Sequence, residues 1–159
     1  MPRKQPGALR AAQQRTPGRL FQPGMIHWLS LSVDAAIRRV EHESDGYTVF
    51  PGATAAALRR CHSFFGLPGR TLYPGLADCP CRGCPLDDVT LARDVLDDVL
   101  ALLPPRAQAE PGRLVALIDR ELFRRTLPDP RAPGHPWLRE AWWRMRSYEG
   151  VIDPPQCGP

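Results

Sequence analysis

Three cysteines, Cys79, Cys81 and Cys84, lie within six residues of one another in a chain that contains only five. A fourth, Cys61, lies upstream, with 17 residues between it and Cys79. Four thiolates complete a closed tetrahedral zinc site, and an iron–sulfur cluster can use the same four ligands. The spacing C-x17-C-x-C-x2-C therefore predicts one metal site on these cysteines, with zinc as the metal and an iron–sulfur cluster as the alternative.

The local pattern favours Cys61 over its neighbour His62 as the fourth ligand. Between residues 54 and 65 the apolar side chains recur at helical spacing, and Cys61 shares their face. His62 points to another side, so we keep it as the substitute for Cys61. At the other end, Pro85 suits the first position of a helix, which places Cys84 where the helix dipole favours a thiolate.

Two other interpretations of the cysteines remain open. Buried cysteines often do nothing but pack, although three in six residues cannot all face one core. Cys81-Arg82-Gly83-Cys84 at a helix start also has the form of a redox dithiol. A thioredoxin-like fold would need an apolar strand just before the dithiol, whereas residues 74–78 read Pro-Gly-Leu-Ala-Asp.

Residues 59–87 combine an arginine- and aromatic-rich helix with the clustered cysteines: Arg59-Arg60-Cys61-His62-Ser63-Phe64-Phe65-Gly66, then Cys79, Cys81, Cys84 and Asp87. This arrangement resembles the zinc-binding module of RecQ-family helicases, although that module has two residues between its first clustered cysteines. The sequence has no phosphate-binding glycine loop ending in Lys-Ser/Thr, so the resemblance does not extend to the ATP-hydrolysing motor of the helicases. The resemblance implies a similar pair of helices joined by zinc, and a link to DNA.

Charge is distributed unevenly along the 159 residues. The first 24 hold five basic residues and no acid, namely Arg3, Lys4, Arg10, Arg15 and Arg19. The remainder has 16 basic and 17 acidic residues, so a large basic face for nucleic acid is not expected there. We therefore expect a protein partner, with DNA as the second partner class.

The ends of the chain differ in composition from its middle. Residues 1–24 are basic, polar and interrupted by Gly and Pro, which predicts a disordered tail. Residues 25–149 form the expected single domain, and 150–159 a flexible tail carrying Cys157. An organellar transit peptide, and Met25 as an internal start, remain alternatives for the first segment.

The location of the protein is predicted from segments that the sequence lacks. No run of about 18 apolar residues is present, so we expect no membrane partner. The basic start has no apolar core of a secretory signal, which favours a cytoplasmic protein with reduced thiols. Reduced thiols in turn favour metal binding over disulfides.

Apolar periodicity predicts a mainly helical domain stapled by the four-cysteine site. We expect helices at 33–42, 54–65, 85–103, from 105 or 111 to 127, and from Pro136 onward. Asp45-Gly46 is also typical of a β-hairpin turn, so helix and hairpin compete over residues 26–50. The clearest stripe is that of the 85–103 helix, formed by Val89, Ala92, Val95, Leu96, Val99, Leu100 and Leu103.

The last helix supplies the candidate partner-binding face. Arg139, Trp143 and Arg146 fall at i, i+4 and i+7, opposite a stripe that contains Trp142. Arginine beside an exposed tryptophan could bind a protein or stack on bases. The competing interpretation is that Trp143 covers the edge of the core while the arginines are solvated.

No arrangement of residues predicts catalysis. Asp94, Asp97 and Asp98 are expected on the solvated face of the 85–103 helix, and no serine elbow or zincin motif occurs. The sequence therefore favours a non-enzymatic zinc-binding interaction module. The alternative function is a redox- or metal-responsive regulator with an iron–sulfur cluster on the same cysteines.

Overall fold

The computed structural model describes residues 29–75, 88–130, 132 and 141–149. Within these ranges the chain forms four α-helices and one 3-10 helix, and its only β-pairing is one isolated antiparallel bridge. The elements are α2 (Leu31–Glu43), α3 (Ala53–Phe65), α5 (Val89–Leu102), α6 (Pro105–Arg125) and η2 (Trp142–Met145). The predicted mainly helical fold is confirmed. Both expected tails, Cys79, Cys81, Cys84 and Cys157 lie outside the described residues.

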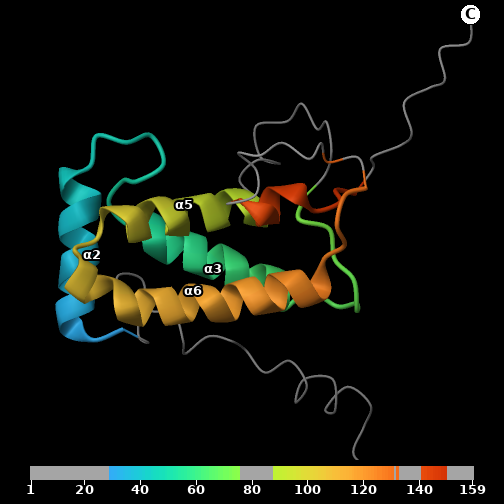
Figure 1. Cartoon of the computed structure of the whole chain (residues 1–159), viewed down its shortest axis with the longest axis horizontal. Coiled ribbons are helices and arrows are strands. Elements are labelled where there is room, and N and C mark those ends of the chain that lie inside the picture. Colours follow the sequence, from blue (N-terminus) through green and yellow to red (C-terminus); the bar gives the residue numbers. More distant parts are fainter. Residues whose placement is uncertain (1–28, 76–87, 131, 133–140, 150–159) are drawn as a thin grey trace, which may run out of the picture.

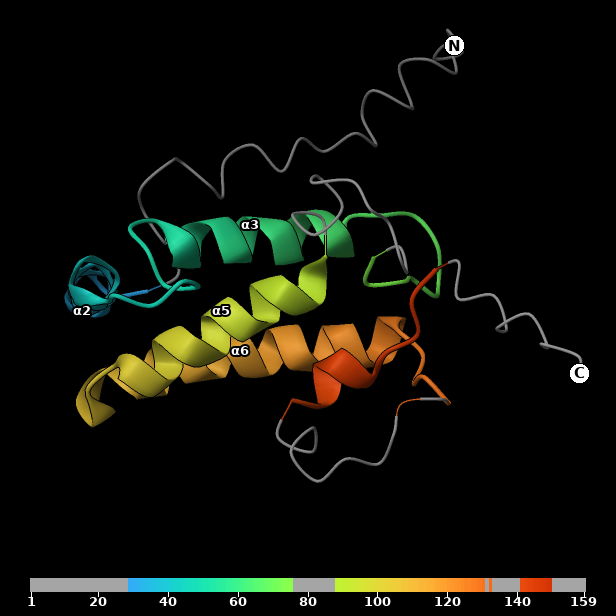
Figure 2. The ribbon, with the colours of Figure 1, turned by 90° about the horizontal axis from the view of Figure 1, so that it is seen from above.

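Three helices lie alongside one another, and the fourth crosses their ends. Figures 1 and 2 show α3, α5 and α6 grouped together, with α2 across the end where α3 begins. Their facing side chains form one apolar core, which includes Ile37, Leu58, Val89, Leu96 and Leu122. The stripe predicted for α5 supplies most of the buried side chains of that helix.

The ambiguity over residues 26–50 is resolved in favour of a helix where the structure describes them. α2 begins at Leu31, two residues before the predicted start at residue 33. The side chain of Glu41 is only 5% exposed, and its carboxylate accepts hydrogen bonds from the backbone N–H groups of Gly52 (2.8 Å) and Thr54 (2.7 Å). An acid of α2 thus satisfies unpaired donors at the positive end of α3.

The other helix boundaries also follow from side-chain caps and prolines. The carboxylate of Asp88 accepts a hydrogen bond of 2.7 Å from the N–H of Thr90, which caps the start of α5. α6 begins at Pro105, where the missing N–H costs nothing, and Pro111 lies inside it at a buried position. Of the two starts predicted for this helix, the structure has the first.

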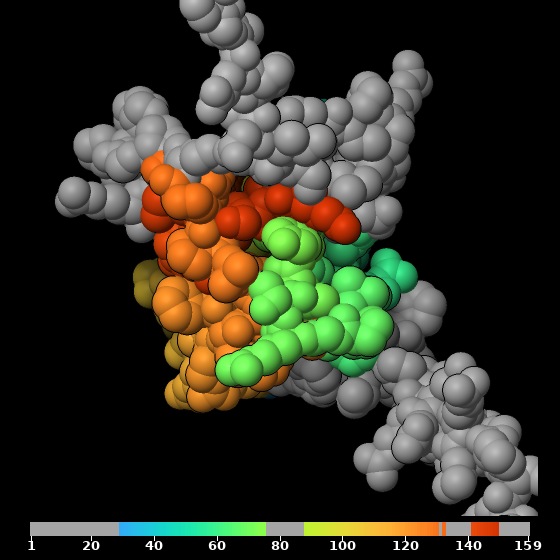
Figure 3. All heavy atoms as spheres, turned by 90° about the vertical axis from the view of Figure 1, so that its right-hand side faces the viewer, coloured from blue at the N-terminus to red at the C-terminus, as the bar shows by residue number. Residues whose placement is uncertain are grey.

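The predicted last helix is wrong over the described residues. Only Trp142–Met145 is helical, as a single 3-10 turn, and Arg146 to Glu149 is not helical. The Ser147 N–H donates to the Leu127 carbonyl (2.8 Å), and the Glu149 N–H donates to the Gly75 carbonyl (3.0 Å). The segment therefore lies against both the chain that follows α6 and the loop that follows α3, and Figure 3 shows it (red) running along the two (orange and green). Backbone pairing with these two loops replaces the continued helix.

Candidate functional site

Cys61 points into the core, as the sequence predicted. Its side chain is 2% exposed and belongs to the apolar cluster between the helices, whereas His62 is half-buried. Burial raises the pKa of the Cys61 thiol to about 12, while the positive charge of Arg93 acts in the opposite direction. Without a bound cation the sulfur would therefore keep its proton near neutral pH.

The ends of the segment that carries the other three cysteines are fixed in place. The Val89 N–H donates to the Pro74 carbonyl (3.2 Å), so the two flanks of residues 75–88 meet at the start of α5. Figures 1 and 2 show the second half of α3 at this same end of α5. In the part of the chain that the structure describes, no three His, Cys, Asp or Glu residues are grouped so as to hold a metal. The predicted set on Cys61, Cys79, Cys81 and Cys84 stays a prediction.

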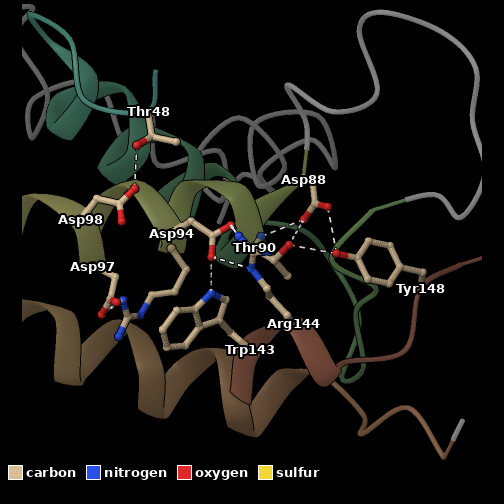
Figure 4. A network of polar contacts seen from close by, with 10 residues as sticks. Thr48, Asp88, Thr90, Asp94, Asp97, Asp98, Trp143, Arg144 and Tyr148 are labelled. Carbon is tan, nitrogen blue, oxygen red and sulfur yellow. Dashed lines mark hydrogen bonds and ion pairs between the residues drawn. The ribbon is translucent and has the colours of Figure 1, made fainter. Parts of the chain in front are cut away.

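A polar network joins α5 to the C-terminal segment (Figure 4). Trp143 is 3% exposed, and its indole N–H donates to the Asp94 carboxylate at 2.8 Å. The Arg144 guanidinium donates two further hydrogen bonds to the same carboxylate, at 2.9 and 2.6 Å. The expectation that Asp94 lies on a solvated acidic face is therefore wrong, because its charge is buried and paired.

Arg93 extends this network to α6. It is 5% exposed and donates to both oxygens of Asp119, at 2.6 and 3.1 Å. Its guanidinium also lies 3.9 Å from the centre of the Trp143 ring, a cation–π contact. Asp97, on the next turn of α5, adds a weaker bond of 3.3 Å. The indole of Trp143 is thus held between an arginine and a carboxylate.

Tyr148 ends the network at the start of α5. Its hydroxyl donates to Asp88 (2.9 Å) and lies 2.9 Å from the hydroxyl of Thr90. Burial raises the pKa of Tyr148 well above its ordinary value, so the hydroxyl stays neutral. These contacts account for the placement of the C-terminal segment, and every member donates to or accepts from a fixed partner.

Two buried arginines bind helix-end carbonyls instead of carboxylates. Arg125 donates to three carbonyls at the end of α3 and just after it, those of Phe65 (2.5 Å), Leu67 (2.8 Å) and Gly69 (2.5 Å). Arg146 does the same at the end of α6, with bonds to the Thr126 hydroxyl (2.7 Å) and to the Phe123 and Thr126 carbonyls. A cation at the negative end of a helix dipole is favourable in both places.

Replacing Arg125 with methionine should lower the free energy of unfolding by about 2–4 kcal/mol, because three carbonyls would lose charged donors. The matched control is Arg124→Met at the adjacent position. Arg124 is exposed, and its ion pair among the described residues is with Glu121, so its loss should leave the free energy of unfolding nearly unchanged. Urea unfolding of both variants measures the difference. Equal effects would mean that the carbonyl contacts of Arg125 contribute nothing.

The predicted partner-binding face is not exposed where the structure describes it. Trp143 and Arg146 are buried, at 3% and 6% exposure, and Arg139 lies outside the described residues. The sequence pattern assigned the two tryptophans the wrong way round, since Trp142 is only half-buried. The cause is the 3-10 turn, which does not keep the helical spacing on which the prediction depended.

A different aromatic cluster is exposed at the end of α6. Phe123 is 63% exposed, and its ring meets that of Trp142 edge-on at 5.7 Å between centres. The Arg146 guanidinium lies 5.0 Å from the Phe123 ring centre and 5.6 Å from that of Trp142. We call Phe123, Trp142 and Arg146 the aromatic cluster. The sequence carries one signal for it, a phenylalanine on the outward side of the α6 pattern.

Comparison of the chain with protein-family models, with curated proteins and with solved structures gives no match in any of the three. Among the described residues, no helix combines the length and the apolar character that crossing a membrane requires.

Proposed function

We propose that this protein is a non-enzymatic, zinc-stapled module that binds another protein. One observation carries the metal part of the proposal. Cys61 faces inward from the second half of α3, the part of that helix that lies at the start of α5, and both flanks of the segment with Cys79, Cys81 and Cys84 meet at that helix start. A single ion bound by the four thiolates would join α3 to α5 through this segment.

The surroundings of Cys61 fit a closed structural zinc site. Such sites exclude water and have no open coordination position, and the Cys61 thiol is 2% exposed. Its raised pKa means that a positive charge must compensate the thiolate, which a divalent ion supplies. The nearby Arg93 is already paired with Asp119, so it cannot fully serve that purpose.

The aromatic cluster supports the binding part of the proposal. Aromatic and arginine side chains dominate the energetics of protein interfaces, and the one aromatic residue of α6, Phe123, is 63% exposed. The guanidinium of Arg146 is held by the Thr126 hydroxyl and by the Phe123 and Thr126 carbonyls, so the two rings pack on a fixed group. Rigid aromatic side chains lose little conformational entropy on binding, which favours them as contact residues.

Phe123→Ala should reduce capture of a protein partner at least about tenfold while leaving the melting temperature nearly unchanged. The partner is first identified by affinity capture and mass spectrometry with the wild-type protein, and its affinity is then measured for each variant. Leu91→Ala is the control, because Leu91 is an exposed apolar residue on α5. Unaltered affinity of Phe123→Ala would show that the aromatic cluster is not the interface.

A further inference from the structure

A second apolar surface is an open groove between α3 and α6, with a volume of about 590 Å³. Phe65 of α3 and Leu114, Leu117 and Ile118 of α6 provide its apolar lining. Leu117 is 52% exposed. An exposed leucine in a hollow with a neighbouring phenylalanine indicates a surface that another apolar segment covers.

The start of the described chain lies at one end of this groove. Leu29 borders the same small cavity as Pro111 and Leu114, and Leu114 also lines the groove. Ser30 is bound to Glu110, another lining residue, through its N–H (2.9 Å) and its hydroxyl (2.7 Å). The described part of the chain therefore begins beside the groove.

We propose that Met25–Trp28 of this same chain lie in the α3–α6 groove. Three of these four residues, Met25, Ile26 and Trp28, carry large apolar side chains. Four extended residues span about 13–14 Å. The lining residues of α6 run from Glu110 to Glu121, a step of about 16 Å, so the segment is long enough to span most of the groove.

The charges at the groove agree with this occupant. Two of the lining residues are acids, Glu110 and Glu121, and one is a base, Arg113. The segment contains no carboxylate, and its only titratable side chain is His27. No like-charge repulsion between acids therefore opposes docking. The proposal concerns a surface separate from the aromatic cluster and does not depend on the zinc site.

A double-mutant cycle tests whether Trp28 contacts the groove. Trp28→Ala should raise the unfolding equilibrium constant about tenfold in the wild-type protein and less than about threefold in a Leu117→Ala background. In a Leu102→Ala background the full tenfold effect should remain. Leu102 is the matched control because it is also 52% exposed but lies on α5 and does not line the groove.

Two further measurements define the occupant. Removal of residues 1–24 should leave the unfolding equilibrium unchanged, because the docked segment starts at Met25. The coupling free energy between Trp28 and Leu117 should also be independent of protein concentration. Analytical ultracentrifugation should find the wild-type protein to be a monomer. Equal effects of Trp28→Ala in all backgrounds would overturn the proposal. So would a dimer that dissociates in Leu117→Ala, since a second copy would then fill the groove.

Discussion

Replacement of Trp143 with alanine should lower the free energy of unfolding by about 3–5 kcal/mol. The indole is 3% exposed, so its removal would leave a large cavity between α5 and α6. The same change would remove the hydrogen bond to Asp94 and the cation–π contact with Arg93. Because all three losses occur at one buried side chain, this is the largest expected effect of a single substitution away from the cysteines.

The adjacent residue provides the control. Trp142 is half-buried, and its ring lies against those of Phe123 and Trp143 and 5.6 Å from the Arg146 guanidinium, so Trp142→Ala should cost less than about 2 kcal/mol. Trp143→Phe should fall between the two, since it keeps most of the packing and loses the bond to Asp94. Urea unfolding measures all three variants. A larger loss for Trp142→Ala than for Trp143→Ala would contradict the buried position of Trp143.

Removal of the proposed zinc should unfold the protein. Structural zinc contributes roughly 10 kcal/mol or more of apparent binding free energy in small domains, which is comparable to the whole stability of a typical domain. A strong chelator should therefore abolish most of the helical circular dichroism signal, and added zinc should restore it. A fully helical protein after complete removal of metal would show that the fold does not depend on the ion.

Regular helices with a clear apolar stripe were predictable from the sequence. The stripe of α5 and the inward orientation of Cys61 follow from 3.6-residue periodicity alone. The helical interpretation of residues 33–42 also agrees with the structure, although the Asp45-Gly46 turn signal competes with it. These predictions were correct because the buried face of a helix can be identified from its own sequence, without knowing which element packs against it.

The polar network could not be predicted because its partners are far apart in the chain. Asp94 and Trp143 are 49 residues apart, and Arg125 contacts Phe65 across 60 residues. Charged residues are usually exposed, so a pattern alone assigns Asp94 and Arg146 to solvent. Both are buried because specific donors or carbonyls satisfy them, and only the tertiary fold supplies those partners.

The prediction of a helix in the C-terminal segment, residues 141–149, was wrong for a related reason. Its apolar residues fit a helical spacing, but backbone pairing with residues 127–129 and with Gly75 stabilises a non-helical path after η2. Because of that path Trp143 is buried and Trp142 is only half-buried, the reverse of the predicted assignment. The exposed position of Phe123 was not predicted, because an apolar periodicity identifies the buried face of α6 and Phe123 lies on the opposite side.

The metal content of the purified protein tests the central claim most directly. Elemental analysis should find one zinc per chain in the wild type and in Cys157→Ser, and none in Cys61→Ser, Cys79→Ser, Cys81→Ser or Cys84→Ser. Zinc that survives in Cys61→Ser but is lost in His62→Ala would assign His62 as the fourth ligand. Iron with matching sulfide, in a brown protein, would identify the cluster instead. A folded wild-type protein that contains no metal would contradict the zinc-stapled module altogether.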